Sequence, residues 1–306
     1  MLNRVMLVTK RSPLEELVLK HQTFGKAEFT LKAAGESIAT YVEEDAHYQA
    51  ALNTIRRQVP NDLPVAVMRR EDLSNANFQF RDTDLIVACG PDGLFVNLAR
   101  YVRDQPVLTV NPGVFGAGTL MLFPPSEVGS AVALIQSGKH HLERLPLLKA
   151  VIDDERVVWA ASDIFIGRTD KVAAWYEISF GRSKEAQGSD GILVASAIGS
   201  TGWIKSVVNM VEGLLEERGR HKLSNLPAAA SNELVFVVQN PISSSAVGRS
   251  IVTGRITPNN PLVVHSRMPE GGSVFSDGML EQAQEWSAGS SVVVSVGERY
   301  VQRVVR

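Results

Sequence analysis

The sequence lacks several features that identify the class of a protein directly, such as paired cysteines, a membrane-spanning run and a secretory signal. Cys89 is the single cysteine among 306 residues, which excludes an internal disulfide and a zinc site built from thiolates. No apolar run approaches the roughly 18 residues that a membrane-spanning helix needs. The first residues, MLNRVMLVTKRSPLEE, show neither the apolar core nor the cleavage site of a secretory signal. We therefore expect a cytoplasmic protein that does not act at a membrane.

An excess of one charge is also absent. Lys and Arg number 31 and Asp and Glu number 33, so the formal net charge is −2 and a strongly basic nucleic-acid-binding protein is excluded. The share of hydrophobic residues is an ordinary 44%, over a length that suggests about two domains. A chain of this length can bury a large core without disulfides or metals.

The first half of the chain alternates strand-like and helix-like segments. Short apolar runs predict strands at 4–8, 63–68, 85–89 and 106–110. Helical composition and spacing predict helices at 46–58 and 94–102. The run 85–89 is apolar throughout, as in a parallel sheet that is covered on both faces. The alternation is typical of a doubly wound, mostly parallel α/β domain, which we expect over residues 1–144.

The second half is rich in short strand-like runs separated by turn residues. Strands are predicted at 151–152, 157–160, 173–179, 191–195, 234–238 and 261–265, with one helix at 206–218. These segments predict a β-rich domain over residues 145–290. Two further strands are predicted at 291–296 and 300–305.

Two small-residue turns could carry chemistry. Gly90-Pro91-Asp92-Gly93 lies between a buried strand and a helix, where glycines let an anion approach backbone amides. Asp92 itself fits either a helix cap or a catalytic carboxylate. The second turn, Ile198–Gly202, is rich in hydroxyls and fits either a polar-ligand site or an ordinary helix cap. Asn111, after the strand 106–110, falls at the sheet edge where α/β domains bind ligands. The patterns of a P-loop and of a dinucleotide-binding fingerprint are absent.

A series of short motifs follows in one order along nearly the whole chain. They stand at 90–94, 110–111, 162–167, 175–179, 190–203, 241–249 and 277–292. In this order they resemble the motifs of the NAD kinase family, including its GGDGT, NE and TGSTAY elements. The stretch 175–179, WYEIS, looks like the YYEIS strand of the family's mitochondrial-type branch.

The resemblance implies a fold and a reaction. The fold would be an α/β N-terminal domain, a β-sandwich-like C-terminal domain, and C-terminal strands over 291–306 that return towards the first domain. The reaction would transfer the γ-phosphoryl group of ATP, or of another donor, to the adenosine 2′-hydroxyl of NAD. Mg²⁺ would accompany ATP and neutralise its phosphates. A homodimer or a higher homo-oligomer is implied as well.

The resemblance also assigns roles to residues. Asp92 would be the general base, Gly90 and Gly93 would face the donor phosphates, and Asn111 would support the site. On the NAD side it assigns Ser162, Asp163, Gly199, Ser200, Thr201, Gly202 and Ser206. No side chain is implied as a metal ligand.

Several positions depart from the family pattern. Pro91 replaces a glycine and so removes an amide donor, and Leu94 replaces a threonine hydroxyl. Ser162-Asp163 stands in place of Asn-Glu. These departures also fit a catalytically silent homologue that binds NAD or another nucleotide. A second alternative is a lipid kinase of the diacylglycerol kinase type, which shares the glycine-Asp-glycine turn.

Overall fold

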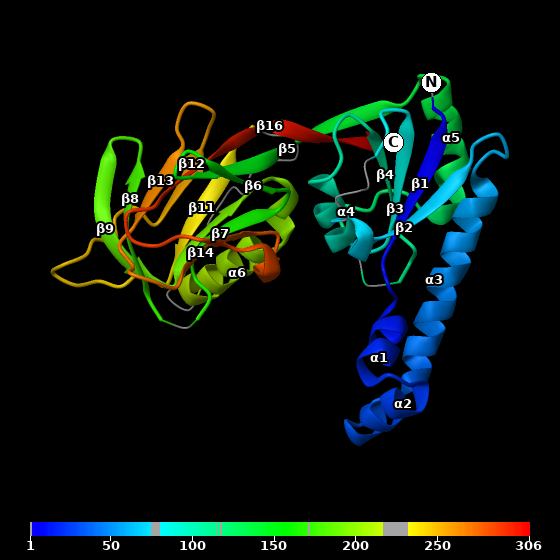
Figure 1. Cartoon of the computed structure of the whole chain (residues 1–306), viewed down its shortest axis with the longest axis horizontal. Helices are drawn as coiled ribbons and strands as arrows, with labels where there is room; N and C mark the ends of the chain where they lie inside the picture. The colour runs from blue at the N-terminus through cyan, green and yellow to red at the C-terminus, as the bar shows by residue number, and fades with distance from the viewer. Residues whose placement is uncertain (1, 75–79, 115, 117, 171, 217–231) are drawn as a thin grey trace. The chain divides into compact units, whose positions relative to one another are not determined.

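The structure is a computed structural model that describes residues 2–74, 80–114, 116, 118–170, 172–216 and 232–306 (Figure 1). The chain forms two compact units. The first comprises Met1–Glu143 together with Val301–Arg306, and the second comprises Arg144–Tyr300. Among the described residues, no helix is both long enough and apolar enough to cross a membrane.

The first unit is built on a parallel sheet. Its strands are β1 (Arg4–Thr9), β2 (Val65–Arg69), β3 (Asp84–Cys89) and β4 (Pro106–Val110). They lie in the order β2-β1-β3-β4, and every neighbouring pair is parallel. The end of β16 (Ser291–Val305) adds to the far side of β4, also in parallel, with Gln302 opposite Pro106. The predicted strands 4–8, 85–89 and 106–110 are confirmed, and the predicted strand at 63–68 begins two residues later.

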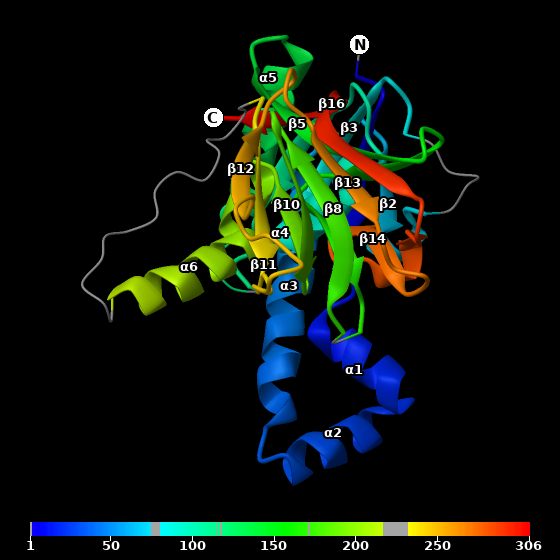
Figure 2. The same ribbon diagram turned by 90° about the vertical axis from the view of Figure 1, so that its left-hand side faces the viewer.

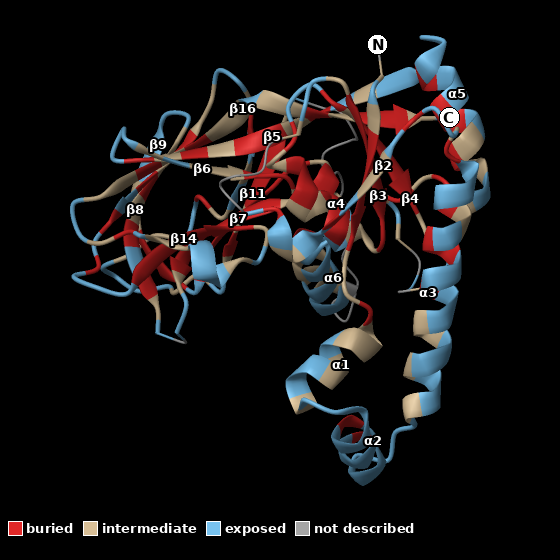
Figure 3. Ribbon diagram, turned by 45° about the vertical axis from the view of Figure 1, so that its right-hand side comes forward, coloured by how far each residue is buried: buried red, intermediate tan, exposed pale blue. Residues whose placement is uncertain are grey.

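The described residues of this unit form five helices. They are α1 (Pro13–His21), α2 (Phe24–Ala33), α3 (Ile38–Gln58), α4 (Asp92–Ala99) and α5 (Val128–Gln136), with short 3₁₀ turns at Arg70–Asp72 and Pro125–Glu127. The buried residues of α3 all lie in its C-terminal half, as the red segments in Figure 3 show. There Tyr48, Leu52 and Ile55 pack into the core that the sheet shares with α5. Helix α3 ends two residues before Pro60, because proline disfavours helical backbone in the residue before it.

The second unit contains two antiparallel layers. One sheet has the order β12-β11-β10-β7-β14-β15. Its strands are β7 (Asp163–Arg168), β10 (Gly191–Ala195), β11 (Leu234–Gln239), β12 (Thr253–Ile256), β14 (Gly272–Ser276) and β15 (Gln284–Glu285). The other layer has β16, β13 (Leu262–Ser266), β8 (Ala174–Phe180) and β9 (Ser183–Ser189), with β5 (His141–Ile152) and β6 (Arg156–Ala160) beside β16.

The two layers share one core, which is what makes this unit a sandwich. Ile164 and Phe236 come from the six-stranded sheet, Tyr176 and Val264 come from the other layer, and all four are buried in the same cluster. On the outer face of the six-stranded sheet, Ile204 of α6 (Trp203–Glu216) packs on β10 and β11. Figure 2 shows α6 beside β11. The predicted combination of an α/β part and a β-rich part is confirmed.

In this unit the structure differs from two of the predictions made from the sequence. The strands predicted at 291–296 and 300–305 are one continuous strand, β16. Gly297 does not break it. A Cβ atom there would lie 2.7 Å from the carbonyl oxygen of Leu147 and against the ring of Trp159, so glycine allows close contact with β5 and β6. The helix predicted at 206–218 begins earlier, at Trp203, and its positions 217 and 218 lie outside the described residues.

Candidate active site

The turn after β3 brings the first motif to the carboxyl edge of the parallel sheet. The amide of Gly90 donates to the carbonyl oxygen of Val110, 3.2 Å away, so the ends of β3 and β4 are tied together. A Cβ atom on Gly90 would lie 2.9 Å from Cδ2 of Leu94, which is itself buried. Glycine is therefore needed here because Leu94 fills the space above its Cα. Pro91 precedes α4 with extended backbone and makes no side-chain cap.

Asp92 is the first residue of α4, and its carboxylate does not cap that helix. Oδ2 accepts from the amide of Thr119 at 2.9 Å, and Oδ1 accepts from the amide of Leu120 at 3.0 Å. A Cβ atom on Gly118 would collide with Oδ1. These contacts fix the carboxylate, and a carboxylate has about four lone-pair sites, so it can still accept a substrate proton. Of the two readings of Asp92, the structure excludes the cap.

Asn111 follows directly at the end of β4. Its amide donates to the carbonyl oxygen of Phe123 at 2.8 Å, and its Oδ1 accepts from the amide of Gly113 at 2.9 Å. Gly113 has φ of +81°, a conformation that favours glycine. The Asn111 side chain therefore shapes the turn that leaves β4. Gly93, by contrast, is exposed, with open space where a Cβ atom would stand.

Lys10 is a residue at this edge that the motif search missed. It follows β1, and a Cβ atom on Gly90 would lie 3.7 Å from its Cγ. The amide of Lys10 donates to the hydroxyl of Tyr48 at 3.2 Å, and that hydroxyl donates to the carbonyl oxygen of Cys89 at 2.9 Å. Burial raises the pKa of Tyr48, so the hydroxyl stays protonated for this bridge. Tyr48 thus holds the stem of a lysine beside the Gly90 turn.

In the second unit, one carboxylate organises the Ser162-Asp163 motif. Asp277 accepts hydrogen bonds from three successive amides: Ala161 at 3.0 Å, Ser162 at 2.8 Å and Asp163 at 3.2 Å. Asp277 has φ of +51° and is followed by Gly278 at +73°, so a left-handed turn after β14 presents the carboxylate. Asp277-Gly278 belongs to the motif series in the sequence, but its role as an acceptor for the 161–163 backbone depends on the fold.

The hydroxyl-rich turn packs directly on this motif. Residues Ile198–Thr201 form a 3₁₀ turn, and a Cβ atom on Gly199 would collide with the carbonyl oxygen of Ser162 and lie 2.8 Å from its Oγ. The same Ser162 carbonyl accepts from the amide of Ser196 at 3.0 Å. The structure therefore brings together Ser162, Gly199 and Gly202, which lie far apart in the sequence.

Asp163 lies deeper than its predicted ligand role suggests. It is 7% exposed, and the hydroxyl of Ser162 donates to its Oδ2 at 2.8 Å. Burial raises the pKa of Asp163, and the hydrogen bond from Ser162 opposes that rise. Thr201, in the adjacent 3₁₀ turn, is an exposed residue.

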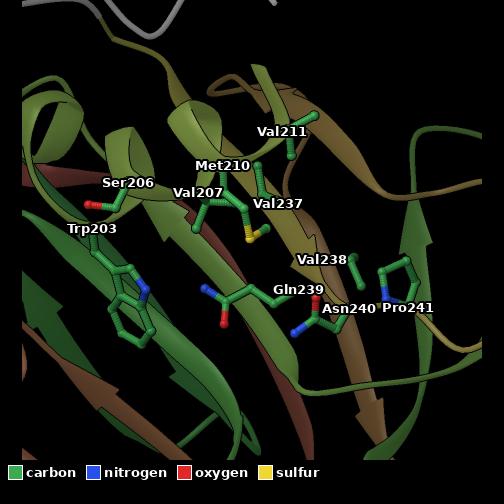
Figure 4. Close-up of a pocket in the computed structure, with 10 residues that line it drawn as sticks. All are labelled: Trp203, Ser206, Val207, Met210, Val211, Val237, Val238, Gln239, Asn240 and Pro241. Atoms are coloured by element: carbon green, nitrogen blue, oxygen red, sulfur yellow. The ribbon is translucent and has the colours of Figure 1, made fainter. Parts of the chain in front are cut away.

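A cavity of about 400 Å³ opens between α6 and β11 (Figure 4). Its lining combines apolar side chains of α6, such as Met210, with the polar groups of Ser206, Gln239 and Asn240. Trp203 stands at one side, and its ring stacks on Phe165 with centroids 5.4 Å apart. An apolar cavity with a few polar groups is typical of a small-molecule site. Ser206 is the predicted NAD-side residue that lines it.

The predicted residues thus form two groups, each within one unit. Gly90, Asp92, Gly93 and Asn111 belong to the first unit, and those from Ser162 to Ser206 belong to the second. Within the described ranges, no group of three or more His, Cys, Asp and Glu residues is placed to hold a metal ion.

No family model matches the chain, but comparisons with known proteins find proteins of similar sequence. It is 35% identical over 140 residues to an NAD kinase of Halorubrum lacusprofundi, covering 43% of this chain and 48% of that protein. It is 28% identical over 174 residues to an NAD kinase of Cupriavidus pinatubonensis, covering 52% and 56%. The chain spans about half the length of the curated relatives it matches.

A solved structure of yeast NADH kinase complexed with NADH has the same fold. Its TM-score is 0.60 at 15% identity, covering 100% of this chain and 84% of that one. Over about half of their length, proteins named NAD kinase are similar to this chain in sequence. The resemblance to the NAD kinase family is confirmed, and the comparisons do not favour the lipid kinase alternative. Placement in the mitochondrial-type branch stays a prediction, as do the individual NAD kinase site residues.

Proposed function

We propose that the chain is an NAD kinase-like phosphotransferase, which transfers the γ-phosphoryl group of ATP or another donor to the adenosine 2′-hydroxyl of NAD and yields NADP. The sequence similarity to proteins named NAD kinase supports this activity, and so does the shared fold. The observation that carries the proposal is Asp92. It keeps a fixed carboxylate at the edge of a parallel sheet, next to the start of a helix.

In this reaction Asp92 accepts the proton of the 2′-hydroxyl as the oxygen attacks the γ-phosphorus. A new oxygen–phosphorus bond forms, the bond to the leaving oxygen breaks, and ADP departs when ATP is the donor. The amides of Asp92 and Gly93 are the first of α4 and have no carbonyl partner within the helix, so they suit donor phosphates. The amide of Gly90 is paired with Val110 and Leu94 fills the space beside its Cα, so Gly90 shapes the turn and does not face the phosphates, while Lys10 contributes positive charge.

Mg²⁺ would arrive with the donor. It neutralises phosphate charge when bound. It usually keeps several waters and takes phosphate oxygens with one or two carboxylates, rather than a dedicated protein cage. We assign the ion to phosphate oxygens of the donor and to water, and we assign no side chain of the described residues to it.

On the NAD side, the proposal assigns recognition to the second unit. Ser162, Asp163 and the 199–202 turn would contact the ribose and nicotinamide side and the adenosine. Ser206 and Trp203 would bind the adenosine where the α6 cavity begins. The stacked ring of Trp203 supplies an aromatic face, as the family's tyrosine would.

NADP formation from NAD, ATP and Mg²⁺ tests the proposal. We expect product from the wild-type protein and none from Asp92→Asn, which keeps the shape of the side chain but cannot act as the base. Asp62→Asn, an exposed aspartate in the same unit, is the matched control and should keep the wild-type rate. Equal rates for Asp92→Asn and the wild type would contradict the assignment of Asp92. Parallel reactions with NADH in place of NAD, and with polyphosphate in place of ATP, show which acceptor and which donor the protein uses.

A silent nucleotide-binding homologue is the second candidate. Pro91 offers no amide to a phosphate, and Leu94 is 1% exposed, packs against Gly90 and offers no hydroxyl to the donor. Calorimetric binding of NAD without product from any donor would favour this alternative.

We further propose that the protein works in the cytoplasm as a homodimer or a higher homo-oligomer, without nucleic acid or membrane partners. Sedimentation velocity of the full chain checks the assembly, and a monomer across the working concentration range would contradict it.

A further inference from the structure

Arg303 is a buried cation in the first unit that the reaction as proposed does not use. It lies near the end of β16 and is 7% exposed. Its Nη2 and Nε donate to Oε2 of Glu143 at 2.5 and 3.1 Å. Burying such a pair costs desolvation, and truncating one partner leaves the other uncompensated.

The same guanidinium reaches the segment that holds Asp92. Nη1 of Arg303 donates to the carbonyl oxygen of Leu120 at 3.4 Å, while the amide of Leu120 donates to Oδ1 of Asp92 at 3.0 Å. One residue therefore links the buried cation to the carboxylate. The guanidinium also lies 5.9 Å from the ring centroid of Phe95, on the helix that Asp92 begins.

This geometry suits arginine in particular. Its planar fork has five donors in fixed directions, so one group can bind Glu143 through two nitrogens and Leu120 through a third. Lysine has a compact ammonium group and cannot hold both partners in the same way. The glutamate fixes the guanidinium, and the guanidinium then fixes the Leu120 carbonyl.

We propose that Arg303 is a positioning residue, which holds the Thr119–Leu120 segment so that Asp92 presents its carboxylate to the acceptor hydroxyl. The proposal rests on the proposed function of Asp92 as general base. Arg303 contacts neither substrate in this scheme. Its loss should therefore lower kcat much more than it raises KM for NAD.

The test compares Arg303→Gln and Arg303→Lys with a matched ion-pair control. Arg4 pairs with Asp84 in the same unit, at the opposite end of β1 and β3 from the Gly90 turn, and Arg4→Gln removes that pair. Each variant is assayed for kcat and KM, for its unfolding midpoint, and for amide hydrogen exchange over 118–121. Misplacing a reacting group by about 1 Å can cost roughly 100-fold in rate.

For Arg303→Gln we expect kcat to fall about 10- to 100-fold, with KM for NAD nearly unchanged and faster exchange over 118–121. Arg303→Lys should recover part of kcat, and it serves alone if the glutamine variant does not fold. Arg4→Gln should lower the unfolding midpoint and keep kcat. Wild-type kcat in Arg303→Gln, or an equal loss of kcat in Arg4→Gln, would overturn the proposal.

A wild-type protein that makes no NADP refutes the proposed function, and the exchange measurement still decides whether Arg303 holds the segment. Unchanged exchange over 118–121 in Arg303→Gln overturns the positioning role whatever the activity.

Discussion

Replacing Asp277 with asparagine tests the carboxylate that holds the 161–163 backbone. Asparagine tolerates the positive φ of this position, so the substitution changes the hydrogen bonds and not the turn. The amide oxygen can keep the bonds to Ser162 and Asp163 and the longer bond to Ala161 at 3.2 Å, but the NH₂ group then also faces the amide of Ala161, where two donors oppose each other. Hydrogen bonds to a charged acceptor contribute roughly 1.5–3 kcal/mol each, against about 1 kcal/mol for neutral ones.

Weakening each of the three contacts by about 1 kcal/mol predicts a fall of about 3 kcal/mol in the free energy of unfolding. For a unit of this size the melting temperature should fall by roughly 5–10 °C. Urea unfolding and calorimetry of the full chain measure both quantities. Asp170→Asn is the control, because that exposed carboxylate binds Arg168 and one amide and should matter little. Wild-type stability in Asp277→Asn would refute the account of this motif.

Three shorter predictions follow from the same sites. Gly199→Ala should reduce stability and NAD affinity, because its Cβ would collide with a Ser162 carbonyl that is fixed by hydrogen bonds; Gly213→Ala, in open space on α6, should reduce neither. Asp163→Asn should stabilise the protein progressively as the pH rises above the ordinary pKa of an aspartate, because the raised pKa of Asp163 means that the folded state binds the proton more tightly, and wild-type stability falls as that proton is lost. A constant stability difference between Asp163→Asn and wild type as the pH rises would contradict the assignment. Lys10→Gln should raise KM for ATP with little effect on KM for NAD, and equal effects on both would argue against a contact between Lys10 and the donor phosphates.

The sequence predicts those parts of the site that depend on local patterns. The apolar run before Gly90 predicts β3 and its turn, because a strand apolar on both faces has few alternatives. Edge strand β9, SKEAQGS, was not predicted because its sequence carries no apolar alternation; among the described strands it pairs with β8 alone.

The partners of the predicted residues could not be read from the sequence. Asp92 is held by residues 27 and 28 positions away, and Leu120 is held by Arg303, 183 positions away. Nothing in the local sequence marks Arg303 as different from an arginine on the surface of a strand. Glu143 and Leu120 become its hydrogen-bond partners only when the chain has folded. The sequence could have identified Lys10 as a site residue, since it follows a predicted strand whose neighbours end at the same edge of the sheet.

The membership of Val301–Arg306 in the first unit sets an order for synthesis. These residues leave the ribosome after all of Arg144–Tyr300, yet they supply the strand beside β4. Domains generally fold as units during translation, the N-terminal one first. Here the N-terminal unit must wait, with Pro106 and Val107 on the far side of β4 unpaired, while the whole β-rich unit is translated. A nascent chain stalled before residue 301 therefore exposes a parallel strand edge, which makes this the stage at which misassembly is most to be expected.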